Sequence, residues 1–284
     1  MDIKASAVGE PSANLTATNS ARVSVNIVGV RLHPMQFASA VDLMEQWISQ
    51  GRPRYVLFPG SDMLAASQRN PRQRAILNAA DLTATDGMML VRLCRWLGAR
   101  DAERVYGPDV MLELCRRSAG KGHRHFFYGG APGVAEELVA RLQKRFSGLL
   151  VAGTYAPPFR RLSEGEFADV TRLINDSGAD IIWVGLSTPK QEIWIADARS
   201  KLNAPLVLGV GAAFDFHAGS ARQAPQWVRS AGGEWLFRLC AEPRRLWRRY
   251  TLQLARFLGL FVLQISGLRQ FPLDQSSADE EALA

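Results

Sequence analysis

The chain has 284 residues, of which 47% are hydrophobic, and it carries a net charge of +7. This length and hydrophobic content allow a substantial core, built as one large α/β domain or as one domain with an appendage. The three cysteines (Cys94, Cys115 and Cys240) are odd in number and widely spaced, which argues against a disulfide framework or a zinc site and favours a reducing, cytosolic compartment.

Residues 1–22 are rich in Ser, Ala and Thr without an apolar core, so we expect a disordered leader and no signal peptide. From about Tyr55 to Phe216, short apolar runs alternate with segments of helical periodicity. This alternation predicts a doubly wound, mostly parallel, Rossmann-like α/β sheet. The expected strands are 23–32 (a strand or a hairpin), 54–58, 82–85, 125–128, 149–152, 181–184 and 206–210, and the expected helices are 34–48, 63–68, 71–77, 88–97, 110–119, 134–146, 167–177 and one that begins at Pro189.

Asp86 directly follows the short expected strand 82–85. It therefore sits at the carboxyl end of a strand, which is where open α/β sheets bind their ligands. The structural alternative is that Asp86 caps the helix that begins at Met88. We rank the functional interpretation first.

The sequence from Gly129 to Gly133, GGAPG, joins a buried strand to a helix. Such a loop lets backbone N–H groups approach a phosphate. It is not a Walker loop, and the next strand ends in Gly153-Thr154-Tyr155 without the acidic residue that would bind a ribose. A nicotinamide-dependent dehydrogenase is therefore disfavoured.

A continuous apolar strand at 181–184 ends at Gly185, and Lys190, Gln191 and Glu192 follow at the start of the next helix. A buried strand that delivers a polar cluster to a helix N-terminus is a common way to build an anion site. The alternative is an ordinary strand–helix turn whose polar residues are only solvated. We favour the site, because a cation, an amide and a carboxylate gather at one point.

The four histidines and the cysteines do not have the spacing of a metal-ligand set. His123 and His125 lie just before a strand, and we predict that they form a solvated surface pair. We expect neither a metal nor a cofactor.

The C-terminal part is basic, with eight arginines against Glu234 and Glu242 between Arg222 and Arg256. A surface of this kind suits nucleic acid, phosphorylated ligands or anionic lipid. Pro243 opens a cationic amphipathic helix that either lies on a membrane surface or packs on the sheet with its arginines solvated. The apolar run 257–265 is too short to span a bilayer.

Seven stretches together resemble the WecG/TagA/CpsF glycosyltransferases, which act on lipid-linked precursors of bacterial surface polysaccharides. They cover most of the chain from about Tyr55 to Tyr250, in the family's order and spacing. The stretches are ATDGMML, RVYGPD, FFYGGAPGVAEEL, WVGLSTPKQE, GVGAAFDFHAG, RQAPQW and EWLFRLCAEPRRLWRRY.

The resemblance implies an inverting, metal-independent transfer of a sugar from a UDP-sugar to a saccharide on an undecaprenyl-type diphosphate. The chain would work as a peripheral protein on the cytoplasmic face of the bacterial membrane, with no nucleic-acid partner, and a homo-oligomer is left open. The implied division is a leader (1–22), a nucleotide-sugar-binding catalytic domain (23–221), an Arg-rich membrane-facing appendage (222–272) and a disordered tail (273–284).

The same resemblance implies roles for single residues. Asp86 matches the general base that takes the proton of the acceptor hydroxyl. Arg104 matches an arginine that stabilises the leaving diphosphate, and Gln191 matches a glutamine near the sugar. Donor binding is assigned to Gly129, Gly130, Gly133, Gly185, Lys190 and Asp215, the last of these near the nucleotide base.

In the appendage, Arg238, Arg245 and Arg248 match arginines that bind the lipid diphosphate. One stretch departs from the family pattern, because residues 58–62 read Phe-Pro-Gly-Ser-Asp where Thr-x-Asn is common. The non-enzymatic alternative is a basic protein that binds nucleotides or anionic lipid, with the α/β core as a scaffold.

Overall fold

The computed structural model describes residues 23–273, apart from the side chains at 245, 246 and 248–250. The described chain begins with an antiparallel hairpin, β1 (Val25–Ile27) and β2 (Val30–Leu32), which forms a separate two-stranded sheet. Of the two alternatives for this stretch, the hairpin is therefore correct.

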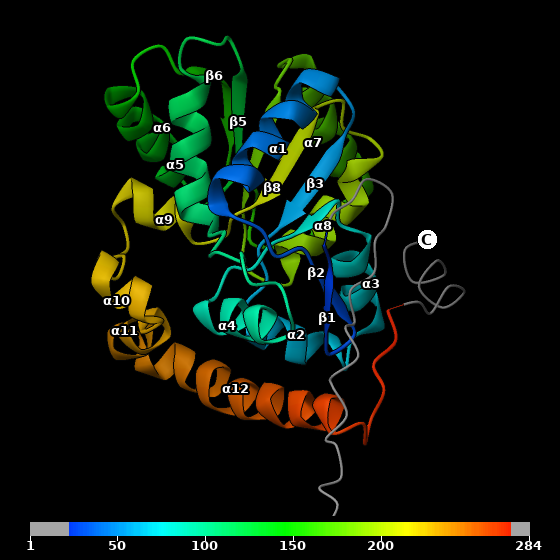
Figure 1. Cartoon of the computed structure of the whole chain (residues 1–284). Helices are drawn as coiled ribbons and strands as arrows, with labels where there is room; N and C mark the ends of the chain where they lie inside the picture. Colours follow the sequence, from blue (N-terminus) through cyan, green and yellow to red (C-terminus); the bar gives the residue numbers. More distant parts are fainter. Residues whose placement is uncertain (1–22, 274–284) are drawn as a thin grey trace, which may run out of the picture.

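A six-stranded sheet forms the centre of the molecule, with the strand order β4-β3-β8-β7-β5-β6 (Figure 1). Every neighbouring pair is parallel, which confirms the predicted doubly wound sheet. All six carboxyl ends therefore lie at one edge, the edge at which such sheets bind ligands. The strands are β3 (Arg54–Leu57), β4 (Leu82–Thr83), β5 (Arg124–Gly129), β6 (Leu150–Tyr155), β7 (Ile181–Gly185) and β8 (Leu206–Gly209).

The central strands are buried on both faces, as a continuous apolar run predicts. In β7, Ile182 and Val184 enter one hydrophobic core, whereas Ile181 and Trp183 enter the core on the opposite face. We call the core that contains Ile182 and Val184 the first core and the opposite one the second core. The first core is built by α2 (Ser61–Ser67), α3 (Pro71–Ala79), α4 (Met88–Trp96), α7 (Glu164–Asp176) and α8 (Lys190–Arg199). The second core is built by α1 (Phe37–Gln50), α5 (Gly107–Ser118), α6 (Val134–Arg145) and α9 (Ala213–Ala218).

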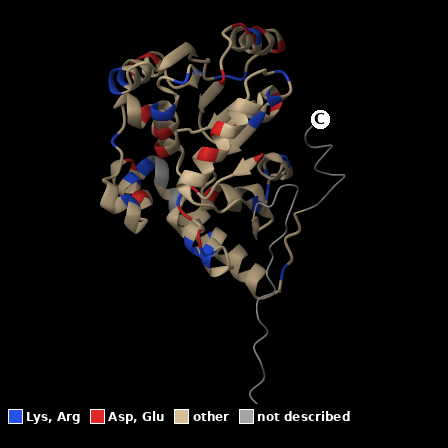
Figure 2. Ribbon diagram, turned by 45° about the horizontal axis from the view of Figure 1, so that its top comes forward, with Lys and Arg blue, Asp and Glu red and all other residues tan. Residues whose placement is uncertain are grey.

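The C-terminal part consists of α10 (Gln226–Ala231), α11 (Glu234–Ala241) and α12 (Pro243–Ile265). The helix predicted to begin at Pro243 is present, and we call these three helices the appendage. Helix α12 crosses one side of the molecule and packs chiefly against α2 rather than on the sheet (Figure 1). Figure 2 shows the later part of this helix in tan, the colour of residues that are neither basic nor acidic. The domain division at residue 222 stays a prediction.

Helix α12 is fixed at its far end by polar contacts with the N-terminal hairpin. The amide of Gln264 accepts a hydrogen bond from Val28 N at 2.7 Å and donates one to Asn26 O at 3.0 Å. Phe257 and Phe261 are buried on the same side of the helix, within the first core. Within residues 23–273, no helix is long and apolar enough to cross a membrane.

His125 corrects one prediction, because it is fully buried instead of solvated. It is an interior residue of β5, which has β6 on one side and β7 on the other. Trp183 Nε1 donates a hydrogen bond to His125 Nδ1 at 2.9 Å. Burial lowers the pKa of His125 to about 3, so the ring is neutral and structural at physiological pH.

Candidate active site

A cleft of about 1580 Å³ opens at the carboxyl edge of the sheet. Its wall is formed by the ends of β3, β7 and β8, by the segments that follow β4, and by α11 of the appendage. The sequence places polar residues at these strand ends, and the parallel topology brings them together. Of the predicted site residues, Asp86, Arg104, Gln191, Gly130, Gly185, Lys190, Asp215 and Arg238 line the cleft, whereas Gly129 and Gly133 do not.

Asp86 lies half-buried in the cleft, between β4 and α4. The N-cap of α4 is Gly87 and no side chain caps that helix, so the capping alternative for Asp86 is wrong. The carboxylate instead accepts a hydrogen bond from the backbone N–H of Gly107. Burial raises the pKa of Asp86 to about 7, and Arg104 opposes this effect. The carboxyl group can therefore exchange a proton near neutral pH.

Arg104 is held on three sides. Its Nε donates to the backbone oxygen of Asp86 at 2.5 Å, and its Nη2 donates to Glu234 Oε2 at 2.5 Å. Its Cζ lies over the Tyr106 ring, 3.8 Å from the centre of that ring. The cation is thus fixed beside Asp86, where it can stabilise negative charge that develops on a ligand.

Gln191, at the start of α8, is buried and uses its amide within the protein. Its Oε1 accepts from Gly211 N at 2.7 Å, and its Nε2 donates to Glu192 Oε1 at 3.2 Å. A Cβ on Gly209 would lie 2.7 Å from the same Nε2, so a glycine there leaves the space that the amide occupies. Gln191 therefore ties α8 to the end of β8 at the floor of the cleft.

Close packing explains two of the candidate glycines. Gly129 and Gly185 are register partners on β5 and β7. A Cβ on Gly129 would lie 2.5 Å from Gly185 O, and a Cβ on Gly185 would lie 2.3 Å from the ring of Phe214. Gly130 N already donates to Gly185 O at 2.9 Å, so this N–H is engaged within the protein.

Lys190 is the first residue of α8 and Asp215 belongs to α9, and both line the cleft. Lys190 is exposed, and its Nζ donates to the backbone oxygen of Phe159 at 3.2 Å. Asp215 accepts a hydrogen bond from Ser220 Oγ at 3.1 Å, which orients its carboxylate. Both side chains remain within reach of a ligand in the cleft.

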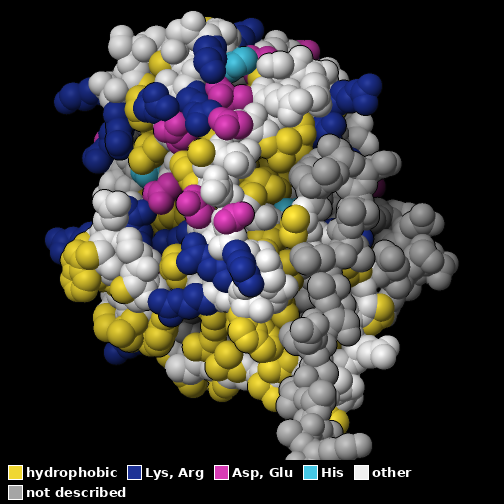
Figure 3. Space-filling model, viewed as in Figure 1, with side chains coloured by type: hydrophobic (Ala, Val, Ile, Leu, Met, Phe, Trp, Pro, Cys, Tyr) yellow, Lys and Arg dark blue, Asp and Glu magenta, His cyan; other side chains and the backbone are white. Residues whose placement is uncertain are grey.

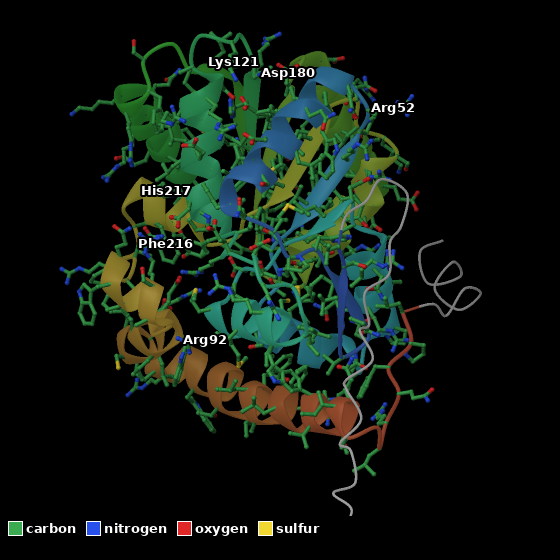
Figure 4. All side chains as sticks on the ribbon, in the orientation of Figure 1. Arg52, Arg92, Lys121, Asp180, Phe216 and His217 are labelled. Carbon is green, nitrogen blue, oxygen red and sulfur yellow. The ribbon has the colours of Figure 1, made fainter. Side chains whose placement is uncertain are left out.

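The appendage contributes Arg238, whose guanidinium lies 5.6 Å from the centre of the Phe216 ring. Phe216 belongs to α9 and points toward the start of the appendage in Figure 4. The side chains of Arg245 and Arg248 lie outside the described part of the structure. Residues 58–62, which depart from the family pattern, contribute Phe58 and residues 60–62 to the wall of the cleft.

Two residues of the site were missed from the sequence, namely Glu234 and Tyr106. Glu234 Oε1 accepts a hydrogen bond from the Tyr106 hydroxyl at 2.5 Å, so Glu234 binds Tyr106 and Arg104 together. Both Glu234 and Tyr106 lie inside stretches that carry the family resemblance. Their pairing across 128 residues of sequence has no local signal.

Among the residues that the structure describes, no three His, Cys, Asp or Glu side chains form a group that could hold a metal ion. That the sugar transfer needs no metal ion, as the resemblance implies, stays a prediction. The polar groups that line the cleft include carboxylates, guanidinium groups, hydroxyl groups, two ammonium groups and the amide of Gln191. They are suited to proton transfer and to the binding of phosphate oxygens.

Comparison with known proteins identifies the family. Residues 25–270 match the model of the glycosyl transferase WecG/TagA/CpsF family. A relative from Bacillus spizizenii, N-acetylglucosaminyldiphosphoundecaprenol N-acetyl-beta-D-mannosaminyltransferase, is 30% identical over 203 residues, which cover 72% of this chain and 77% of that protein. The resemblance found in the seven stretches is thereby confirmed, and the chain belongs to the WecG/TagA/CpsF family of glycosyl transferases.

Proposed function

We propose that this protein is an inverting glycosyltransferase that moves a sugar from a UDP-sugar to a saccharide on undecaprenyl diphosphate, in the synthesis of a cell-surface polysaccharide. The observation that carries the proposal is the half-buried carboxyl group of Asp86, whose pKa is raised to about 7, beside the fixed guanidinium of Arg104. The name of the Bacillus relative supports an acceptor with a diphosphoundecaprenol carrier.

The chemistry is a single displacement. Asp86 takes the proton from the acceptor hydroxyl as that oxygen bonds to the anomeric carbon of the donor. The bond from this carbon to the β-phosphate oxygen breaks in the same step, so the configuration inverts and UDP leaves. Arg104 stabilises the charge that grows on the departing diphosphate.

The size of the cleft supports a reaction between two bound substrates. Its volume of about 1580 Å³ exceeds the roughly 300–1,000 Å³ that is usual for a single small ligand. A nucleotide-sugar and the sugar end of a lipid-linked acceptor would therefore fit side by side. The acceptor would enter from the appendage, the source of Arg238.

The surface of the appendage supports work at a membrane. Figure 3 shows hydrophobic side chains gathered over this part of the molecule, with Lys and Arg next to them. Contiguous exposed apolar surface of this kind is typical of interaction sites, and with basic residues beside it suits an anionic lipid surface. The exposed side chains are Trp227, Trp235, Leu236, Trp247, Leu252, Leu258, Val262 and Ile265.

The test is sugar transfer from a panel of UDP-sugars to a lipid-diphosphate acceptor in EDTA. Asp86→Asn should lower the rate by about 10²–10⁴-fold, the contribution typical of a general base. Asp176→Asn is the matched control, since Asp176 is exposed at the end of α7 and lies outside the cleft. Activity that survives in Asp86→Asn would contradict the role of base.

A basic binding protein without catalytic activity is the alternative, and the apolar surface of the appendage is compatible with it. Transfer from no donor, together with no increase in melting temperature on addition of UDP, would favour that alternative. An increase with UDP but not with NAD supports the nucleotide-sugar site. A transfer that requires a divalent ion would contradict the metal-independent mechanism.

A further inference from the structure

Glu234 joins the appendage to the candidate active site. It is the first residue of α11, and its side chain is 12% exposed. One carboxylate oxygen accepts from Arg104 Nη2 and the other from the Tyr106 hydroxyl, both at 2.5 Å. A partly buried carboxylate that bridges a cation and a phenol makes strong, charge-assisted hydrogen bonds. We call this group of three side chains the Glu234 clasp.

We propose that Glu234 is a positioning residue, which docks α11 on the cleft and holds Arg104 in the orientation that serves Asp86. The inference rests on the proposed function for its catalytic consequence. Its structural consequence, that docking of the appendage and the state of Asp86 depend on one carboxylate, stands on the geometry alone.

The orientation of Arg104 depends on Glu234 because the other two contacts leave it a way to rotate. The bond from Nε to Asp86 O and the contact with the Tyr106 ring fix the plane of the guanidinium. The bond from Nη2 to Glu234 then fixes its direction within that plane. Nη1 makes none of these bonds and is the part of the cation left for a ligand.

Glu234 also contributes to the electrostatic environment of Asp86. Four side chains with charge or a titratable group surround this carboxyl: Arg104 and Tyr106 from the segment before α5, and Glu234 and Arg238 from α11. Burial raises the pKa of Asp86, and Glu234 adds to the increase, whereas Arg104 and Arg238 lower it. Without the carboxylate of Glu234 the effect of the two cations would lose this opposing charge, the pKa of Asp86 would be lower, and Asp86 would become a weaker base.

A second ion pair links the appendage to the core without reaching Asp86. Arg229 on α10 donates to both oxygens of Asp109 on α5, at 2.9 and 3.1 Å. Removal of Glu234 would therefore loosen α11 and leave α10 attached. The loss of protection against hydrogen exchange should be confined to the backbone of 234–241.

The first experiment measures Asp86 directly, in protein with ¹³C-labelled Asp carboxyl groups, the signal being assigned by its loss in Asp86→Asn. In Glu234→Gln the titration of Asp86 should move to lower pH by about one unit, the lower end of the effect of a nearby charge. Hydrogen exchange at 234–241 should become faster in the same variant. Glu113→Gln is the matched control, because Glu113 also pairs with arginines, Arg116 and Arg117, but lies outside the cleft.

Glu234→Asp keeps the charge and shortens the side chain, so it provides a second test if Glu234→Gln unfolds. It should speed exchange at 234–241 while the titration of Asp86 stays close to that of the wild type. An unchanged titration in Glu234→Gln, or unchanged exchange in both variants, would overturn the proposal. Neither readout requires transfer activity.

The second experiment measures transfer against pH. In Glu234→Gln, the acid limb of kcat/KM should move to lower pH together with the carboxyl titration, and Glu113→Gln should follow the wild type. A uniform decrease in rate with an unmoved limb would show a merely structural role and overturn the catalytic consequence. Absence of transfer in the wild type would refute the proposed function instead. The carboxyl titration would still show whether the Glu234 clasp sets the pKa of Asp86.

Discussion

The sheet and the appendage are held in place by different means. The four residues from Ile181 to Val184 in β7 are fully buried, and apolar packing on both faces fixes their position. Helices α10 and α11 contain no buried residue and attach through polar contacts of Arg229 and Glu234. The sheet is therefore a rigid platform, whereas docking of these two helices depends on a few charges and can respond to a ligand or a surface.

The largest effect on stability should come from Trp183→Ala in β7. Trp183 is fully buried between β5 and β8, and removal of such a ring lowers the free energy of unfolding by about 3–5 kcal/mol. Urea unfolding measures the loss. Trp227→Ala in α10 is the control, since a side chain that is 75% exposed should change stability by less than about 0.5 kcal/mol. Equal decreases in the free energy of unfolding in the two variants would contradict the proposed difference in packing between the sheet and the appendage.

Gly185→Ala should have the next largest effect. The added methyl group would lie 2.3 Å from the Phe214 ring, and such overpacking lowers the free energy of unfolding by about 1–3 kcal/mol. Gly165→Ala in α7 is the matched control, because a Cβ there has no neighbour within 4 Å. That control should stabilise the protein by about 0.4–1 kcal/mol. If Gly185→Ala leaves the free energy of unfolding unchanged, the structure around β7 and Phe214 can shift to accommodate the methyl group.

The raised pKa of Asp86 should have a smaller effect on stability, and this effect should depend on pH. Burial raises its pKa to about 7, above the value of about 4 in an unfolded chain. Between these values the folded protein holds a proton that the unfolded chain has released, so stability should fall as the pH rises from about 4 to about 7. Asp86→Asn should remove this decrease and raise the free energy of unfolding at pH 8 by about 1–2 kcal/mol. This increase is smaller than the full pKa shift implies, because Asp86 faces the cleft and solvent screens its charge. Urea midpoints across this range measure it, with Asp176→Asn expected to keep the slope of the wild type.

The two regions also differ in how well the sequence predicts them. Apolar runs such as 181–184 identify the buried strands, and the rule that parallel strands share a carboxyl edge brings Asp86 and Gln191 to one cleft. Helices α10 and α11 were not predicted, because with six and eight residues they are too short to establish a helical period. His125 was misjudged, since a polar residue at the start of a run gives no sign that two strands will flank it.

The candidate site shows the same limit at the level of single contacts. Asp86 and Arg104 could be named because they belong to short stretches with a recognisable pattern. Their dependence on Glu234 could not, because an ion pair across 130 residues is set by how α11 docks and not by local sequence. The glycine loop predicted backbone contacts with phosphate, yet Gly130 N is already bound to Gly185 O.

The contact between Gln264 and the N-terminal hairpin has a consequence for synthesis of the chain. Val28 leaves the ribosome early, but its hydrogen-bond partner follows 236 residues later. Val28 N and Asn26 O therefore wait for this partner until Gln264 has emerged. Since domains fold during synthesis from the N-terminal side, the parallel sheet would form before this contact. The bonds between Gln264 and the hairpin would then close around a sheet that is already formed.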